Sequence, residues 1–127
     1  MTRWLIVLLS AVFVLYSGCT TYSQGKRIYE SKCANCHGIK GEGLAALYPA
    51  LDKSIIITHY KSRIPCIIEL GRSSRDSLGN LTSEMPPVKG LTVAEITNLI
   101  NYLLTLNPNG QETVTIDSVK VWSEACN

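Results

Sequence analysis

The sequence predicts a small all-α domain, and three observations indicate this class. The chain has 127 residues, which gives room for one hydrophobic core and no second domain. Apolar residues recur at steps of three and four positions in two regions, 24–36 and 92–106, as they do along one face of a helix. Between these regions glycine and proline interrupt the chain, and the sequence contains no internal repeat. We therefore expect short helices joined by loops.

The clearest helix is expected to begin at Thr92. Glu95 stands three residues later, so the two side chains can form a capping box at the helix N-terminus. The helix is expected to end where Pro108 and Gly110 interrupt the pattern. The apolar stripe predicted to face the core consists of Val93, Ile96, Leu99, Ile100, Leu103 and Leu104.

The rest of the chain gives weaker patterns. Residues 38–52 are rich in glycine and predict a loop, and 55–70 predict a helix that Pro65 kinks or restarts. Residues 71–89 are expected to form the longest irregular stretch, which in so small a domain is usually functional or flexible. Beyond residue 111 we expect a short strand or turn and then a helix.

The first 18 residues predict a signal peptide. Arg3 gives a minimal positive start, residues 4–16 are apolar apart from Ser10, and small residues precede Cys19. The apolar stretch is shorter than the roughly 20 residues that cross a bilayer. An uncleaved anchor is the alternative.

Residues 15–19, Leu-Tyr-Ser-Gly-Cys, resemble the lipobox of bacterial lipoproteins. The resemblance implies that Cys19 becomes the first mature residue and carries a diacylglyceryl group, with 19–23 as a short tether. The protein would then be membrane-anchored by this lipid on the periplasmic or cell-surface side. Tyr16 stands where the lipobox commonly has leucine, so cleavage by ordinary signal peptidase is the alternative.

The pentapeptide Cys33-Ala34-Asn35-Cys36-His37 predicts the chemistry of the domain. On a helix the two thiols lie one turn apart on one face, the reach needed to add to two vinyl groups along one porphyrin edge. The next residue turns by about 100° and faces the iron. The motif therefore predicts one covalent haem c, with thioether links to Cys33 and Cys36 and His37 on the iron.

Three other chemistries fit the same residues less well. A thioredoxin-like dithiol is expected within a βαβ unit, and no strand is predicted before this motif. A zinc site would need Cys33, Cys36, His37 and His59 together, with an awkward adjacent pair. A nucleophilic cysteine assisted by His37 would require neighbouring helical side chains to point together, whereas they diverge.

The second axial ligand of the iron is expected to be Met85. Without the leader, Met85 is the only methionine and His59 the only histidine besides His37. Pro86 and Pro87 restrict the backbone after Met85 and can hold its thioether in one orientation. His59 is the alternative ligand, and Met85 can otherwise be a gap-filler in the core.

Five cysteines indicate an oxidising compartment once their roles are assigned. Cys19 is assigned to the lipid, and Cys33 and Cys36 are assigned to the haem. Cys66 and Cys126 remain as a pair that could form a disulfide. Two buried free thiols are the alternative. The formal net charge of +2 and the pI near 8.3 are too mild for nucleic-acid binding, so we expect redox partners, either proteins or small molecules.

Residues 24–106 resemble a class I cytochrome c, with 107–127 as a C-terminal extension, possibly disulfide-linked to the domain. The residues that carry the resemblance are the motif with its following glycine, Cys33 to Gly38; the loop to Tyr48-Pro49-Ala50-Leu51; the pair Met85-Pro86; and Gly25 and Tyr29 set against Leu99 and Tyr102.

The resemblance implies that the first and last helices of the domain cross closely around the haem. It assigns Tyr48 and Pro49 to the haem-binding residues, and the carbonyl of Pro49 or Ala50 would accept the second ring N–H of His37. It implies a non-enzymatic electron carrier with His/Met ligation. Two alternatives stay open: a haem subunit of a larger oxidoreductase, and a ligand sensor in which Met85 is displaced.

Overall fold

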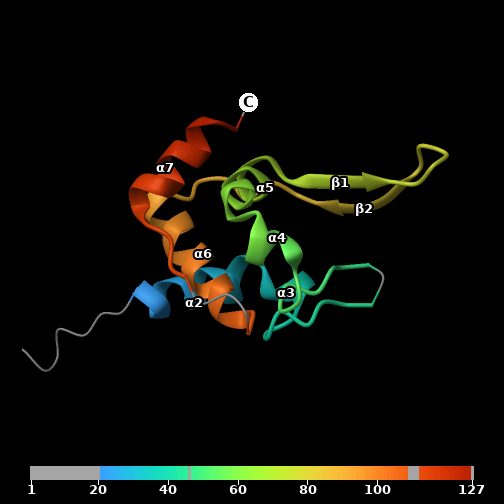
Figure 1. Ribbon diagram of the computed structural model, residues 1–127. Helices are drawn as coiled ribbons and strands as arrows, with labels where there is room; N and C mark the ends of the chain where they lie inside the picture. Colours follow the sequence, from blue (N-terminus) through green and yellow to red (C-terminus); the bar gives the residue numbers. More distant parts are fainter. Residues whose placement is uncertain (1–20, 46, 109–111, 127) are drawn as a thin grey trace, which may run out of the picture.

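The computed structural model describes residues 21–45, 47–108 and 112–126, so the predicted signal peptide and Cys19 lie outside the described residues. This described part is mostly helical and carries one small pair of strands (Figure 1). The elements are α2 (Thr21–Lys32), α3 (Ala34–His37), α4 (Ile55–His59), the 3-10 helix η1 (Lys61–Arg63), α5 (Ile64–Leu70), β1 (Arg72–Arg75), β2 (Leu81–Met85), α6 (Val93–Leu106) and α7 (Ile116–Glu124).

Helices α2 and α6 cross at Gly25, which confirms the predicted crossing. A Cβ on Gly25 would overlap the carbonyl oxygen of Asn98 and would lie 2.8 Å from the Cβ of Tyr102. Only glycine allows the two backbones to approach this closely. Beside the crossing, the ring of Tyr102 lies 5.2 Å from that of Tyr29, tilted by 49°.

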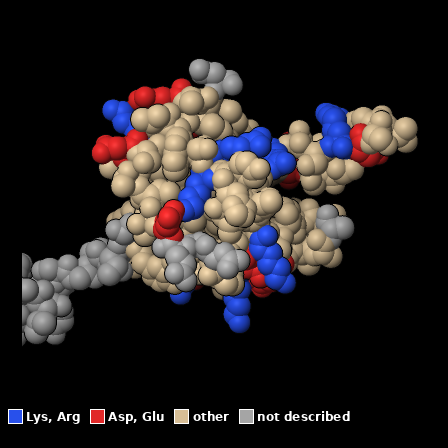
Figure 2. All heavy atoms as spheres, viewed as in Figure 1, with Lys and Arg blue, Asp and Glu red and all other residues tan. Residues whose placement is uncertain are grey.

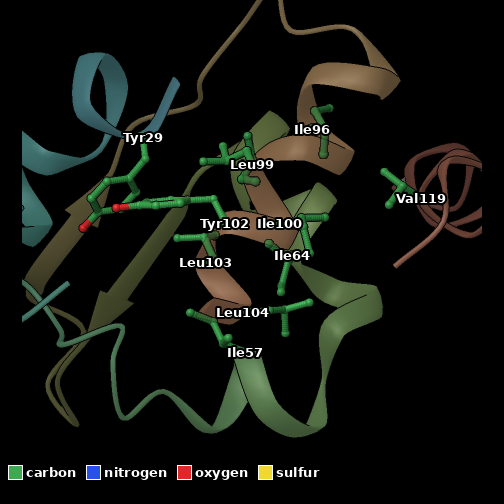
Figure 3. Close-up of a cluster of buried hydrophobic side chains, with 11 residues drawn as sticks. Tyr29, Ile57, Ile64, Ile96, Leu99, Ile100, Tyr102, Leu103, Leu104 and Val119 are labelled. Carbon is green, nitrogen blue, oxygen red and sulfur yellow. The ribbon is translucent and has the colours of Figure 1, made fainter. Parts of the chain in front are cut away.

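The core forms along α6 (Figure 3). The capping box predicted at Thr92 is present, since its side chain accepts from the Glu95 amide while the Glu95 carboxylate accepts from the Thr92 amide. The predicted stripe faces the core: Ile96, Leu99, Ile100, Leu103 and Leu104 are buried, and Val93 is partly buried against them. Tyr102 of α6 and residues of α2, α4, α5 and α7 complete the cluster, the latter being Tyr29, Ile57, Ile64, Ile68 and Val119.

Residues 55–70 form three short pieces in place of one helix. Pro65 stands in the first turn of α5, where its missing N–H costs no helical hydrogen bond. The prediction that Pro65 restarts the helix is therefore confirmed. Ile57, Ile64 and Ile68 are buried, so all but the 3-10 turn contribute to the core.

Residues 71–89 are more regular than predicted, because they contain an antiparallel hairpin. Arg72 pairs with Met85 and Ser73 with Glu84, with a register shift between Ser74 and Arg75. At the tip, Asp76 Oδ1 accepts hydrogen bonds from the amides of Leu78 and Asn80. The hairpin projects from the body on the same side as the loop between α3 and α4 (Figure 1).

The C-terminal segment forms α7, and residues 112–115 just before it contain no strand, so of the predicted strand or turn only an irregular stretch is seen there. Thr115 caps the helix by accepting from the Ser118 amide, and Val119 is fully buried. Cys126 is bonded to Cys66 of α5, with 5.2 Å between the two Cα atoms. Among the helices described here, none has the length and apolar character that would let it cross a bilayer.

Candidate functional site

The residues of the C-x-x-C-H motif lie in and just before a short helix, α3, and Cys33 interrupts the helical geometry in front of it. Cys33 interrupts the helical pattern of 24–36 with φ −120° and ψ −39°, so α2 ends at Lys32 and α3 starts at Ala34. The His37 amide nevertheless donates to the Cys33 carbonyl at 2.9 Å, so Cys33 and His37 are still separated by one helical turn. Cys33 and Cys36 are both free thiols and both half-buried. This is the spacing that the haem interpretation requires.

His37 is held in a defined orientation. Its side chain is 8% exposed, and its Nδ1 lies 3.0 Å from the carbonyl oxygen of Pro49. A carbonyl oxygen can only accept, so Nδ1 carries a ring proton, and in the neutral ring Nε2 is then the nitrogen with the free lone pair. A neutral imidazole with its other nitrogen on a carbonyl is the usual form of a metal-ligating histidine. Of the two acceptors that the resemblance implied, the structure selects Pro49.

The loop after α3 is closed around His37 by backbone hydrogen bonds. The Gly43 amide donates to the His37 carbonyl at 2.8 Å, and the Leu51 amide donates to the Gly41 carbonyl at 2.7 Å. Tyr48, half-buried, pairs with Leu44 across this loop. The fold of the loop therefore fixes the position of Pro49 and, through it, the ring of His37.

Tyr29 supports the same site from α2. Its side chain is fully buried, and its hydroxyl donates to the Gly38 carbonyl at 2.6 Å. Sequence reasoning assigned Tyr29 only to helix packing and missed this bond. A signal existed, because the hydroxyl of a buried tyrosine nearly always finds a partner.

The residues of the site fit a haem group. The donor set is one buried imidazole with an available Nε2 and two thiols a helical turn apart. Beside them, Leu44 is 55% exposed and Leu47 is 61% exposed, which leaves apolar surface on the loop that a flat macrocycle can cover. Figure 2 shows the surface notched between the projecting hairpin and this loop.

The electrostatics of the thiols do not favour a redox dithiol. Burial, with a smaller contribution from the neighbouring Cys36, raises the pKa of the Cys33 thiol to about 11. Catalytic dithiols work through a lowered pKa, because the thiolate is the nucleophile. No strand precedes the motif in the described residues either, since β1 and β2 both follow it.

The structure places the two candidate second ligands differently. Met85 is the last residue of β2 and is half-buried, immediately before Pro86. His59 is exposed at the end of α4 and borders a hollow of about 470 Å³, together with Lys61, Ser62 and Trp122. Across the described ranges, no three His, Cys, Asp or Glu side chains group closely enough to hold a metal ion.

Comparison with known proteins gives one family. A family model described as cytochrome c matches residues 22–107, which is more than half of the chain. A search of curated proteins finds no match. The matched range contains Cys33, Cys36, His37 and Met85, and it ends before α7. The chain therefore belongs to the cytochrome c family, whose members hold haem c with its iron covalently and exchange electrons with redox partners.

Proposed function

We propose that this protein is an electron carrier outside the cytoplasm, with a single haem c whose iron is ligated by His37 and Met85. The observation that carries the proposal is the hydrogen bond from His37 Nδ1 to Pro49, because it orients the ring and fixes its tautomer. The family match supplies the haem and the electron transfer. The second ligand, the single haem and the location are the parts proposed here.

Cys33 and Cys36 are the residues that would hold the group covalently, and His37 would provide one axial nitrogen. When bound, the haem supplies an iron that changes valence by one electron. The protein supports this with a His37 ring kept in place by Pro49 and with a hydrophobic core against which Cys33 and Ala34 pack. If His37 and Met85 both hold the iron, the group would keep no position open for a substrate.

Met85 is favoured as the second ligand by its surroundings. The Val88 amide, three residues on, donates to the Ile68 carbonyl at 2.8 Å, which fastens the chain after Met85 to α5. A Cβ on Gly71 would overlap the Met85 carbonyl oxygen, so the two backbones are in close contact. A thioether on a fastened segment is better suited to bind iron than the exposed imidazole of His59. A methionine ligand also raises the reduction potential.

The test is a visible and near-infrared spectrum of protein made together with haem-attachment machinery. The ferric wild type is expected to show the sulfur-to-iron charge-transfer band, and Met85→Ala to lose it. His59→Ala is the matched control and is expected to keep the band. Loss of the band in His59→Ala with retention in Met85→Ala would reverse the assignment.

The same preparation tests the carrier role and the single haem. Iron and protein are expected in equal molar amounts, and the red colour is expected to stay with the denatured chain after acid acetone extraction. The reduced wild type is expected not to bind carbon monoxide under native conditions. Ready binding of carbon monoxide would favour the ligand sensor, and a partner that co-purifies in fixed ratio would favour a subunit of a larger enzyme.

We also propose that Cys19 carries lipid and holds the protein on a membrane surface. The support is the likeness of residues 15–19 to a lipobox. The tether predicted over 19–23 is shorter than expected, because residues 21–23 already belong to α2. Cells fed a labelled fatty acid are expected to label the wild type and not Cys19→Ser. A wild type that stays unlabelled and is released in soluble form would contradict the lipid anchor.

A further inference from the structure

Residues 112–126 lie beyond the family match and are docked firmly on the domain. The side-chain amide of Asn101 in α6 exchanges two hydrogen bonds with the backbone of Val114, at 2.8 and 3.1 Å. Val119 is fully buried against the core (Figure 3), and Lys61 pairs with Glu112 at 3.3 Å. The segment is therefore an integral part of the fold.

The end of this segment is bonded to the helix that borders the hairpin. Cys126 follows α7, and its partner Cys66 lies on α5, 60 positions earlier in the chain. Helix α5 has only seven residues. A helix of that length has little stability of its own and depends on tertiary contacts. The disulfide supplies one such contact on the side that faces α7.

Helix α5 in turn holds the segment that carries Met85. The Ile68 carbonyl accepts from the Val88 amide at 2.8 Å, and the Glu69 carbonyl accepts from Lys89 Nζ at 2.8 Å. Gly71, just after α5, is packed so closely on Met85 that a Cβ would not fit. An isolated two-stranded hairpin is marginal in water, so β1 and β2 cannot fix Met85 unaided.

We propose that the C-terminal extension, residues 112–126, is a clamp that holds α5 and, through α5, keeps Met85 in its position. The disulfide between Cys66 and Cys126 is the covalent link of this clamp. The hydrogen bond from the Val88 amide to the Ile68 carbonyl connects α5 to the segment that carries Met85. The consequence for iron ligation rests on the proposed role of Met85.

The experiment compares the haem-loaded wild type with Cys66→Ser/Cys126→Ser, using Lys120→Ala on the exposed side of α7 as a control. Imidazole is titrated into the ferric protein, and loss of the sulfur-to-iron band is followed. The double variant is expected to bind imidazole about tenfold more tightly, a change that corresponds to about 1.4 kcal/mol. Lys120→Ala is expected to match the wild type.

Hydrogen exchange provides a second readout that does not depend on the iron ligand. In the double variant the Val88 amide is expected to exchange faster, while the central amides of α6 keep their protection. Equal protection of Val88 in both proteins would overturn the clamp. If the wild type lacks the sulfur-to-iron band, the proposed ligation fails instead, and the exchange of Val88 alone decides the clamp.

A variant with the disulfide intact covers the case in which the double variant does not fold. Val88→Pro removes the N–H that Ile68 accepts and leaves Cys66 and Cys126 bonded. It is expected to raise imidazole affinity as the double variant does. Imidazole binding equal to that of the wild type would show that the restraint does not pass through Val88, and the proposal would be withdrawn.

Discussion

His37 and Met85 lie on segments that the fold supports in different ways. His37 is buried, its ring is bonded to Pro49, and the carbonyl of the next residue accepts from the buried hydroxyl of Tyr29. Tyr29 itself packs on Tyr102 of α6. The histidine segment is thus connected directly to the close crossing of α2 and α6.

Met85 has few such connections. It is the last residue of β2, whose partner strand β1 is largely exposed. At the tip of the hairpin, Leu78 is 85% exposed. The bonds that hold this side run to α5, a short helix at the edge of the core. Regions with few buried contacts open locally at low free energy, whereas the core opens only on global unfolding. We therefore expect the histidine side to be rigid before haem is attached and the methionine side to need extra restraint.

The largest effect is expected at the crossing itself. Gly25→Val would place side-chain atoms on the Asn98 carbonyl and against Tyr102, and the helices would have to separate. We expect a loss of about 3 kcal/mol or more in the free energy of unfolding. Urea unfolding followed by circular dichroism measures it.

Gly90→Ala is the control for this substitution. Gly90 has a φ of +83° and open space where a Cβ would stand, so the change costs backbone strain alone, about 1–2 kcal/mol. If Gly25→Val is no more destabilising than Gly90→Ala, the close crossing is not what holds the histidine side.

Tyr29→Phe is expected to have a moderate effect. It keeps the ring against Tyr102 and removes only the hydroxyl that donates to Gly38. We expect a loss of about 1 kcal/mol, the usual net contribution of one buried hydrogen bond. Tyr22→Phe, on an exposed ring of the same helix, is the matched control and is expected to be neutral. Equal stability of the two variants would remove Tyr29 from the support of His37.

The pH dependence of the same pair sharpens this test. Burial, followed by the charge interaction with Cys33, raises the pKa of Tyr29 above its ordinary value of 10.0. The unfolded chain therefore ionises Tyr29 first as the pH rises, so its contribution is complete below pH 10 and declines above it. The stability difference between wild type and Tyr29→Phe is expected to shrink from neutral pH to about pH 11. A constant difference would contradict the raised pKa.

The helical elements with strong local signals were predictable from sequence. The capping box at Thr92 and the apolar stripe of α6 depend on residues close together in the chain, and both are present in the structure. The break at Cys33 was not predictable, because the apolar pattern continues through it. The hairpin was missed since Arg72-Ser73-Ser74-Arg75 has no alternation of apolar and polar residues.

The residues of the candidate site likewise fall into those that the sequence predicted and those that only the structure revealed. The C-x-x-C-H spacing identified Cys33, Cys36 and His37 because the chemistry of attachment requires that spacing. Pro49 was one of two acceptors until the loop geometry selected it. The hydroxyl of Tyr29 was missed because its partner, Gly38, is a backbone carbonyl, which the sequence does not mark. Met85 as iron ligand stays a prediction.

The smallest effect is expected at the hairpin tip. Asp76→Ala removes the carboxylate that accepts from the amides of Leu78 and Asn80. Because the tip buries no side chain, we expect the global unfolding midpoint to stay unchanged while these two amides exchange faster. Ser77→Ala, in the same turn, is the control and is expected to change neither. A clear drop in the midpoint with Asp76→Ala would mean that the hairpin contributes to the stability of the core, and the contrast between the two ligand segments would then be weaker than the structure indicates.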